Sequence, residues 1–427
     1  QRAAGVDLEA LELAVRDAAL TAGASVLEDL LRDVGVGRRE DKVRCSCGAS
    51  MQSRGVKTKS IETLLGRIRF GRSAYQCPQC ARVRHPGDEE LDVVKTGYSP
   101  GVRRLTADLA SDAPFKRVAH QLKAAAALAI SRKDCERIAE GVGEDMGRWF
   151  DVERDRMRFM EPPPPQAEKT IDTLYVQFDG TGVPMVPHEL AGRKGKQKDG
   201  SAKTREAKLG CVFTQTAFDE KGRPIRDPVS TTFVGAIEGA EHFQWRIYAE
   251  AVRRGLFQAK RVVIVTDGAE WIRNIVQTHF PNSIHIIDLY HAREHLVDLC
   301  KLLFHRDLRK LNQYKDRWWD DLDEGNIETI VEQARAFLPK DPNAMKDARQ
   351  HVGYFDKNKE RMRYADYFDQ GLFVGSGVIE AGCKTVIGQR LKQSGMEWTV
   401  RGANAIAALR CAVKSNRFED YWEQRIA

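Results

Sequence analysis

Three carboxylates stand in sequence settings that suit metal-dependent chemistry. Asp179 and Asp267 each follow an apolar, β-rich run, end the predicted strand, and are followed at once by glycine. Neighbouring strands that end together place such side chains at one edge of a sheet, where α/β folds usually carry their sites. Glu380 lies at the start of a glycine-bracketed helix that can pack against that edge. Mg²⁺ or Mn²⁺ ions held there would stabilise the attacking and leaving oxygens of a phosphodiester displacement.

Cysteines form a second candidate metal site. Cys45 and Cys47 form a C-x-C pair, Cys77 and Cys80 form a C-x-x-C pair, and a β-rich run separates the pairs. Each pair supplies two thiolates from one tight turn, which suits tetrahedral zinc. The C-x-C spacing departs from the commoner C-x-x-C, so free thiols or a degenerate ribbon are the alternatives.

Basic residues gather in three blocks of a chain whose net charge is +7. Ten Lys and Arg face one acid between residues 42 and 84, seven face two acids in 191–208, and seven face one acid in 381–417. Such blocks indicate a polyanion with an extended backbone, although each one alone also fits a solvated face. The predicted contacts to DNA phosphates are Arg193, Lys194, Lys196, Lys198, Lys203, Arg205, Lys384, Arg390, Lys392 and Arg401.

The elements that must position these residues follow from periodicity and punctuation. In the helical region, a helix at Phe115–Ala127 and another from Ser131 to about Val142 fit either a helix-turn-helix or a helical hairpin. The second domain reads as α/β, with the order β-β-β-α-β-α-β followed by helices. The predicted divisions are an N-terminal helix (1–40), a zinc-ribbon-like β segment (41–98), a helical DNA-binding region (99–160), a Pro-rich linker (161–168) and a catalytic domain (169–427) with a helical insertion at about 292–370.

Several long runs make the chain similar to a known family. The runs FDGTGVPMV, AKTREAKLGCVFTQT, TDGAEWI, DLYHAREH and GLFVGSGVIEAGCKTVIGQRLKQSGMEWTVRGANAI resemble bacterial insertion-sequence transposases of the ISKra type, in the Mutator-like DDE group. The resemblance implies an RNase H-like catalytic domain whose DDE triad is Asp179, Asp267 and Glu380. It also implies that Asp288-Leu-Tyr-His291 is the C/D-x-x-H motif, with His291 beside the metal site. The alternative for His291 is a strand-end histidine bonded to the backbone.

The expected activity is therefore that of a DNA transposase, which cleaves the element's ends and transfers 3′-hydroxyl strands to target DNA. Its partner would be double-stranded DNA, bound by a homodimer or higher oligomer because joining two ends needs two active sites. The alternatives are a domesticated DNA-binding relative and an RNase H-like structure-specific nuclease. No run of about 18 apolar residues predicts a membrane span, so a cytoplasmic, nucleoid-associated protein is expected.

Overall fold

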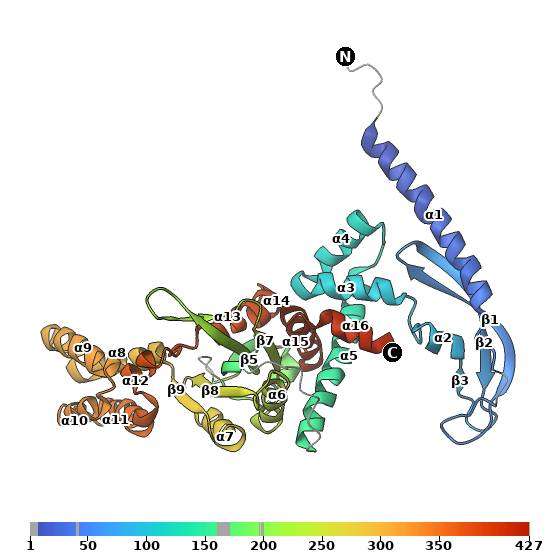
Figure 1. The fold of residues 1–427 in the computed structure, drawn as a ribbon. Coiled ribbons are helices and arrows are strands. Elements are labelled where there is room, and N and C mark those ends of the chain that lie inside the picture. Colours follow the sequence, from blue (N-terminus) through green and yellow to red (C-terminus); the bar gives the residue numbers. More distant parts are fainter. Residues whose placement is uncertain (1–6, 40–41, 160–170, 196, 198–199, 427) are drawn as a thin grey trace, which may run out of the picture. The chain divides into compact units, whose positions relative to one another are not determined.

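The computed structural model describes residues 7–39, 42–159, 171–195, 197 and 200–426. Its chain divides into two compact units, residues 1–142 and 143–427 (Figure 1). The predicted linker 161–168, together with Lys196 and Lys198, lies outside the described residues. None of the described helices combines the length and the apolar character that crossing a bilayer requires.

The first unit begins with a long helix and an antiparallel β-hairpin. Strands β1 and β2 pair from Gln52–Gln76 to Thr63–Gly66, and β3 adds to β2. Ile61, Ile68 and Phe70 of the hairpin form a small core, against which Leu27 and Leu31 of α1 pack. The elements are α1 (Leu8–Val34), β1 (Gln52–Thr63), β2 (Gly66–Gln76), β3 (Val83–Arg84) and α2 (Pro86–Glu90).

Three helices follow: α3 (Pro100–Asp112), α4 (Phe115–Ala126) and α5 (Arg132–Arg158). Ala127 ends α4 in the left-handed conformation, and Ser131 accepts from the backbone N–H of Asp134 at 3.1 Å, so the predicted break is confirmed. The predicted end of the next helix near Val142 is wrong, because α5 continues to Arg158. Its second half belongs to the second unit, where buried Met146, Phe150 and Met157 supply apolar contacts that the sequence pattern did not assign.

The second unit is built on a mixed sheet, which confirms the α/β class. Among the described residues its strands lie in the order β6-β5-β4-β8-β9, and β7 also pairs with β5. Strand β4 is antiparallel to β5 and parallel to β8, and β8 is parallel to β9. The predicted order β-β-β-α-β-α-β is found, with short β6 added. The elements are β4 (Ile171–Pro184), β5 (Thr204–Phe218), β6 (Pro224–Arg226), β7 (Thr232–Ala236), α6 (Ala240–Arg253), β8 (Ala259–Thr266), α7 (Glu270–His279) and β9 (Ile284–Ile287).

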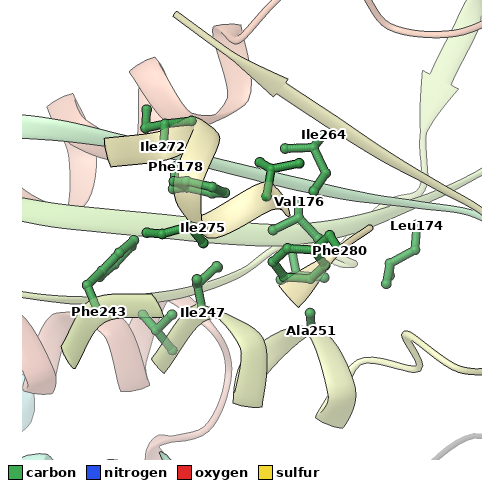
Figure 2. Close-up of a cluster of buried hydrophobic side chains, with 13 residues drawn as sticks. Leu174, Val176, Phe178, Phe243, Ile247, Ala251, Ile264, Ile272, Ile275 and Phe280 are labelled. Carbon is green, nitrogen blue, oxygen red and sulfur yellow. The ribbon is translucent and has the colours of Figure 1, made fainter. Parts of the chain in front are cut away.

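Alternation along β4 gives the sheet two differently used faces. Leu174, Val176 and Phe178 point to one face and form the main core with α6 and α7 (Figure 2). On the other face Tyr175 donates to Gln215 Oε1 at 2.7 Å and accepts from the backbone N–H of Phe373 at 3.1 Å. This second face therefore binds the chain that leads to Glu380, and Asp179 belongs to the same alternating set.

Helices after β9 form a group of their own in Figure 1, followed by the elements that carry Glu380 and the C-terminus. Helix α8 packs on α9 and α11, so the residues predicted to form a helical insertion form a helical bundle. The helices are α8 (Leu289–Phe304), α9 (Leu308–Asp323), α10 (Ile327–Ala336), α11 (Pro342–Asn358), α12 (Tyr364–Asp369), α13 (Gly377–Gly382), a π-helical turn (Cys383–Gly388), α14 (Gln389–Leu391), α15 (Val400–Lys414) and α16 (Phe418–Ile426).

Candidate active site and metal-binding residues

One pocket of about 330 Å³ brings together the carboxylates that the sequence analysis selected. Asp179, Asp267 and Glu380 all line it, although they come from β4, the end of β8 and α13. His291 lines the same pocket. We call this the carboxylate pocket, and its lining is Phe178, Asp179, Thr266, Asp267, Asp288, Tyr290, His291, Glu294, Ser376, Ile379 and Glu380.

The register of two parallel strands places the two aspartates level with each other. The last pair of the β4–β8 ladder is Gln177 with Val265, so Asp179 and Asp267 both lie two residues further on. Adjacent strands are about 4.8 Å apart, which makes these residues neighbours. Asp267 follows β8 directly, as predicted. Asp179 does not end its strand, because β4 continues to Pro184 by pairing with β5, a partner whose length the sequence pattern could not specify.

Glu380 is carried to the pocket by a chain segment that Gln177 holds. The Gln177 amide donates to the carbonyl of Gly375 at 3.1 Å and accepts from the N–H of Ile379 at 3.1 Å. Ser376 Oγ donates to Glu380 Oε1 at 2.8 Å. Gln177 is fully buried, so its two hydrogen bonds position the first turn of α13 relative to the sheet.

Asp288 joins the start of α8 to the same segment. Its Oδ1 accepts from the N–H of His291 at 2.6 Å and caps α8, while its Oδ2 accepts from the N–H of Ser376. Since Asp288 is buried, it acts as a fixed brace between α8 and α13. The side chain of His291 faces the pocket, and its Nδ1 lies 3.7 Å from Glu294 Oε2. The strand-end alternative for His291 is wrong, because His291 lies in the first turn of α8.

The electrostatics of the pocket disfavour negative charge when no cation is bound. Burial raises the pKa of Asp179, the N–H of Gly180 opposes this at 2.6 Å, and the charges of Asp267 and Glu380 raise it further. Cys383 is close behind, with its thiol donating to Asp179 Oδ2 at 4.0 Å. A divalent cation would relieve this repulsion, and oxygen donors from two or three carboxylates are the ligands that Mg²⁺ or Mn²⁺ prefers.

The four clustered cysteines also converge. Cys45 Sγ lies 3.5 Å from Cys80 Sγ, and Cys47 Sγ lies 3.5 Å from Cys77 Sγ. All four sulfurs are within 4.8 Å of one another, the only such group of potential metal ligands in the described part of the chain. Zinc–sulfur bonds of about 2.3 Å in a tetrahedron place sulfurs roughly 3.8 Å apart, so these thiols can hold a metal ion such as zinc.

The thiols are also electrostatically unequal. A backbone hydrogen bond from Cys47 lowers the pKa of Cys45 to about 6, and one from Cys80 lowers the pKa of Cys77. For Cys80 a backbone hydrogen bond from Arg82 acts in the same direction, but the other thiols prevail and raise its pKa to about 11. These opposed shifts arise because the four thiols are close together, so a thiolate at one sulfur disfavours a thiolate at the next unless a cation lies between them.

The predicted DNA contacts do not all lie on the surface. Arg193, Lys194, Lys203, Lys384, Lys392 and Arg401 are exposed, and Arg401 also pairs with Glu144. Arg205 is half-buried and pairs with Glu189 at 3.3 Å. Lys392 also donates to Thr181 Oγ1 on β4. Arg390 is fully buried, with its guanidinium 5.3 Å from the Trp398 ring centroid, so its predicted phosphate contact is wrong.

Sequence reasoning missed several residues that line the carboxylate pocket or act on its lining. Ser376 and Gln177 position the Glu380 helix, and Glu206 of β5, opposite Gly182, adds a further acid whose charge acts on Asp179. The spacing Ser376-x-x-x-Glu380 on a helix start could have indicated the first of these. Gln177 acts through hydrogen bonds to a segment that lies 198 residues or more further along the chain, and Glu206 is placed by the pairing of β4 with β5, and no local pattern records either.

Comparisons with known proteins reach most of the chain at low similarity. A Streptococcus gallolyticus protein, "UPF0236 protein in vanSb 3′region", is 20% identical over 373 residues, which are 86% of this chain and 75% of that protein. A solved structure, "Drosophila P element transposase strand transfer complex", is 12% identical with a TM-score of 0.25, covering 79% of this chain and 83% of that one. The model of UPF0236, described as an uncharacterised protein family, matches residues 238–424, a range that contains Asp267, His291 and Glu380 but begins after Asp179.

Proposed function

We propose that this protein is a DDE transposase that cleaves the ends of an insertion sequence and joins their 3′-hydroxyls to target DNA. The observation that carries the proposal is the meeting of Asp179, Asp267 and Glu380 in one pocket, from three elements that are far apart in the sequence. The sheet order and the mixed strand directions support an RNase H-like catalytic domain. The specific ISKra-type, Mutator-like assignment rests on the sequence runs.

The residues of the pocket divide the work. Asp179, Asp267 and Glu380 would hold Mg²⁺ or Mn²⁺, which supplies Lewis acidity and activates the attacking hydroxyl in phosphodiester displacement. Gln177 and Asp288 hold the Glu380 segment in place before DNA arrives. His291 is half-exposed on the pocket wall, where its ring can donate to an oxygen of the scissile phosphate.

The other proposed contacts are with DNA outside the pocket. Exposed basic side chains would bind backbone phosphates, contacts that position a duplex without reading its sequence. These side chains are Arg193, Lys194, Lys203, Lys384 and Lys392. The first unit, with zinc at its four cysteines and with helices α3 to α5, would recognise the terminal repeats. Two active sites are needed to join two ends, so we propose a dimer or higher oligomer on DNA.

The deciding experiment incubates the full chain with a labelled duplex that carries the DNA flanking its own gene, in Mg²⁺ or EDTA. We expect metal-dependent nicking at the element ends and joining to a second DNA. Asp267→Asn should reduce both by at least about 100-fold, since it removes a metal ligand. The matched control is Asp307→Asn, an exposed helix cap outside the pocket, which should retain activity.

The outcomes separate the alternatives. Hydrolysis of branched or hybrid substrates without joining would make the protein an RNase H-like nuclease. Binding of the duplex without cleavage in any metal, unchanged in Asp267→Asn, would make it a DNA-binding relative and would overturn the proposed chemistry.

A further inference from the structure

A second pocket of about 470 Å³ begins at the residue that follows Asp267. Gly268 lines it, together with residues of α7, α11 and the turn after α11. We call it the basic pocket, and its lining is Gly268, Glu270, Arg273, Arg349, Gln350, Gly353, Tyr354, Lys357, Asn358 and Arg361. Four cations thus face one carboxylate in a hollow that the activity proposed above does not use.

The cations of this pocket are not neutralised by the protein. None of Arg273, Arg349, Lys357 and Arg361 has a recorded ion-pair partner within the described residues. Asp356, which precedes Lys357 on α11, instead pairs with Arg335 at 2.8 Å and with Lys359 at 3.5 Å. Like charges held in one hollow repel each other, so an arrangement of this kind favours binding of an anion.

Arg361 gives the most direct sign that the basic pocket favours an anion. Its Nη2 donates to Asn358 Oδ1, but its Nη1 is buried and has no hydrogen-bond partner within the described chain. Burial lowers the pKa of Arg361, and the neighbouring Arg273 lowers it further. Burying a guanidinium nitrogen without an acceptor is energetically costly, and an oxyanion in the pocket would offset that cost.

The basic pocket and the carboxylate pocket share the turn that holds Asp267. Asp267 Oδ1 accepts from the N–H of Ala269 at 2.9 Å, and Tyr354 of α11 donates to the Asp267 carbonyl at 3.3 Å. Gly268 has φ +86°, and a Cβ there would meet Ile287 at 3.0 Å, Asn358 at 3.5 Å and Tyr354 at 3.5 Å. Two consecutive residues therefore line the two pockets: Asp267 lines the carboxylate pocket and Gly268 lines the basic pocket.

We infer that the basic pocket binds a phosphate group of the DNA strand beside the phosphate that reacts at the carboxylates. Phosphate is the ligand because planar guanidinium groups match its oxygens and can bond them in pairs. The DNA source rests on the proposed function, since a strand that places one phosphate at Asp267 carries the next ones past Gly268. The helical insertion thereby becomes part of the DNA-binding surface through α11.

The test measures binding without cleavage. Fluorescence anisotropy with a mixed-sequence labelled duplex in EDTA is recorded at NaCl between about 50 and 200 mM for the full chain. The variant Arg349→Gln/Lys357→Gln removes two exposed cations of the pocket. We expect affinity at about 100 mM salt to fall by roughly tenfold, and the slope of log K against log salt to fall by about 1, the change expected when the contact with one phosphate is lost.

The matched control removes the same two charges from another helix of the insertion. Arg309→Gln/Lys310→Gln changes exposed residues of α9 that do not line the pocket, and affinity should change by less than about twofold. Equal losses in both double variants would overturn the inference, since they would reflect net charge alone. Thermal unfolding of each variant checks that the fold is retained.

A second arm identifies the source of the phosphate. Wild type is heated in inorganic phosphate and in chloride of equal ionic strength. A melting temperature raised by phosphate in wild type but not in Arg349→Gln/Lys357→Gln, with unchanged DNA affinity, would assign the pocket to a small phosphate compound and overturn DNA as its ligand. If the wild type binds no duplex, the proposed function itself is contradicted. If the wild type binds duplex and the pocket variant has the same DNA affinity as the control variant, only the inference about the basic pocket is contradicted.

Discussion

Asp288 shows how one buried side chain can hold together the wall of the carboxylate pocket. Its two oxygens accept from the N–H groups of His291 and Ser376, so removing them leaves a helix uncapped and a partly buried N–H unpaired. We predict that Asp288→Ala lowers the free energy of unfolding by about 2–4 kcal/mol, measured by urea denaturation. Asp307→Ala, which removes only an exposed cap of α9, should cost about 1 kcal/mol. Equal losses would show that the brace to Ser376 contributes nothing.

A pair of histidines, His295 and His351, predicts that the stability of the fold is sensitive to acid. Burial and the neighbouring His291 and His351 lower the pKa of His295 to about 4 from 6.5, and His295 Nδ1 lies 2.9 Å from His351 Nδ1. Between pH 6.5 and about 4, His295 therefore binds a proton in the unfolded chain but stays neutral in the folded chain. Stability should fall as the pH decreases from 6.5 to about 4.

The measurement is the melting temperature across this pH range. His295→Gln should lose part of the acid sensitivity, because it removes the group whose pKa differs between the two states. His188→Gln, at an exposed position of the second unit, should keep the wild-type profile. A profile for His295→Gln that matches wild type would refute the assignment.

Single residues also show where sequence reasoning succeeds and fails. The position of Asp267 directly after a strand was predictable because an apolar β-rich run, a carboxylate and a glycine follow one another in the chain. Arg390 was misread because a basic residue in a basic run gives no sign of which helix face is buried. The cations of the basic pocket were overlooked because Arg273, Arg349 and Arg361 lie on separate elements, which only the fold brings together.

The turn between β8 and α7 carries the clearest prediction for an element. Gly268 combines positive φ with neighbours that a methyl group would crowd, so Gly268→Ala adds both backbone strain and contact. We expect a loss of about 1–3 kcal/mol in unfolding free energy, together with loss of cleavage because Asp267 is adjacent. Gly222→Ala has a similar φ, +73°, with nothing within 4 Å of its Cβ, so it should show the strain alone and keep activity.

Elements were predictable in proportion to how local their causes are. The strand before Asp267 was found because apolar β-branched residues fill it, and the break before α5 because Ser131 caps the following helix. The length of α5 was not, because its second half has few apolar positions in sequence terms and is stabilised by packing in the second unit. The extension of β4 beyond Asp179 likewise depends on β5, its distant partner.

The whole chain has two compact units, and each holds one candidate metal site. The cysteine cluster lies in residues 1–142 and the carboxylate pocket in residues 143–427. A ligand that binds only the folded form raises the stability of the unit that holds it. We therefore predict two calorimetric transitions, since multidomain chains commonly depart from two-state unfolding.

The two transitions should respond to different ions. A zinc-selective chelator should lower the temperature of one transition and leave the other in place, and Cys77→Ser should have the same effect. The control variant Cys135→Ser changes a buried cysteine outside the cluster and should retain bound zinc. Mg²⁺ should raise the other transition in wild type and not in Asp179→Asn. That variant should be at least as stable as wild type in EDTA, because the raised pKa of Asp179 means that its charge opposes folding. A single transition that moves with both ions would contradict the independence of the units. It would indicate that the continuous helix α5 couples their unfolding.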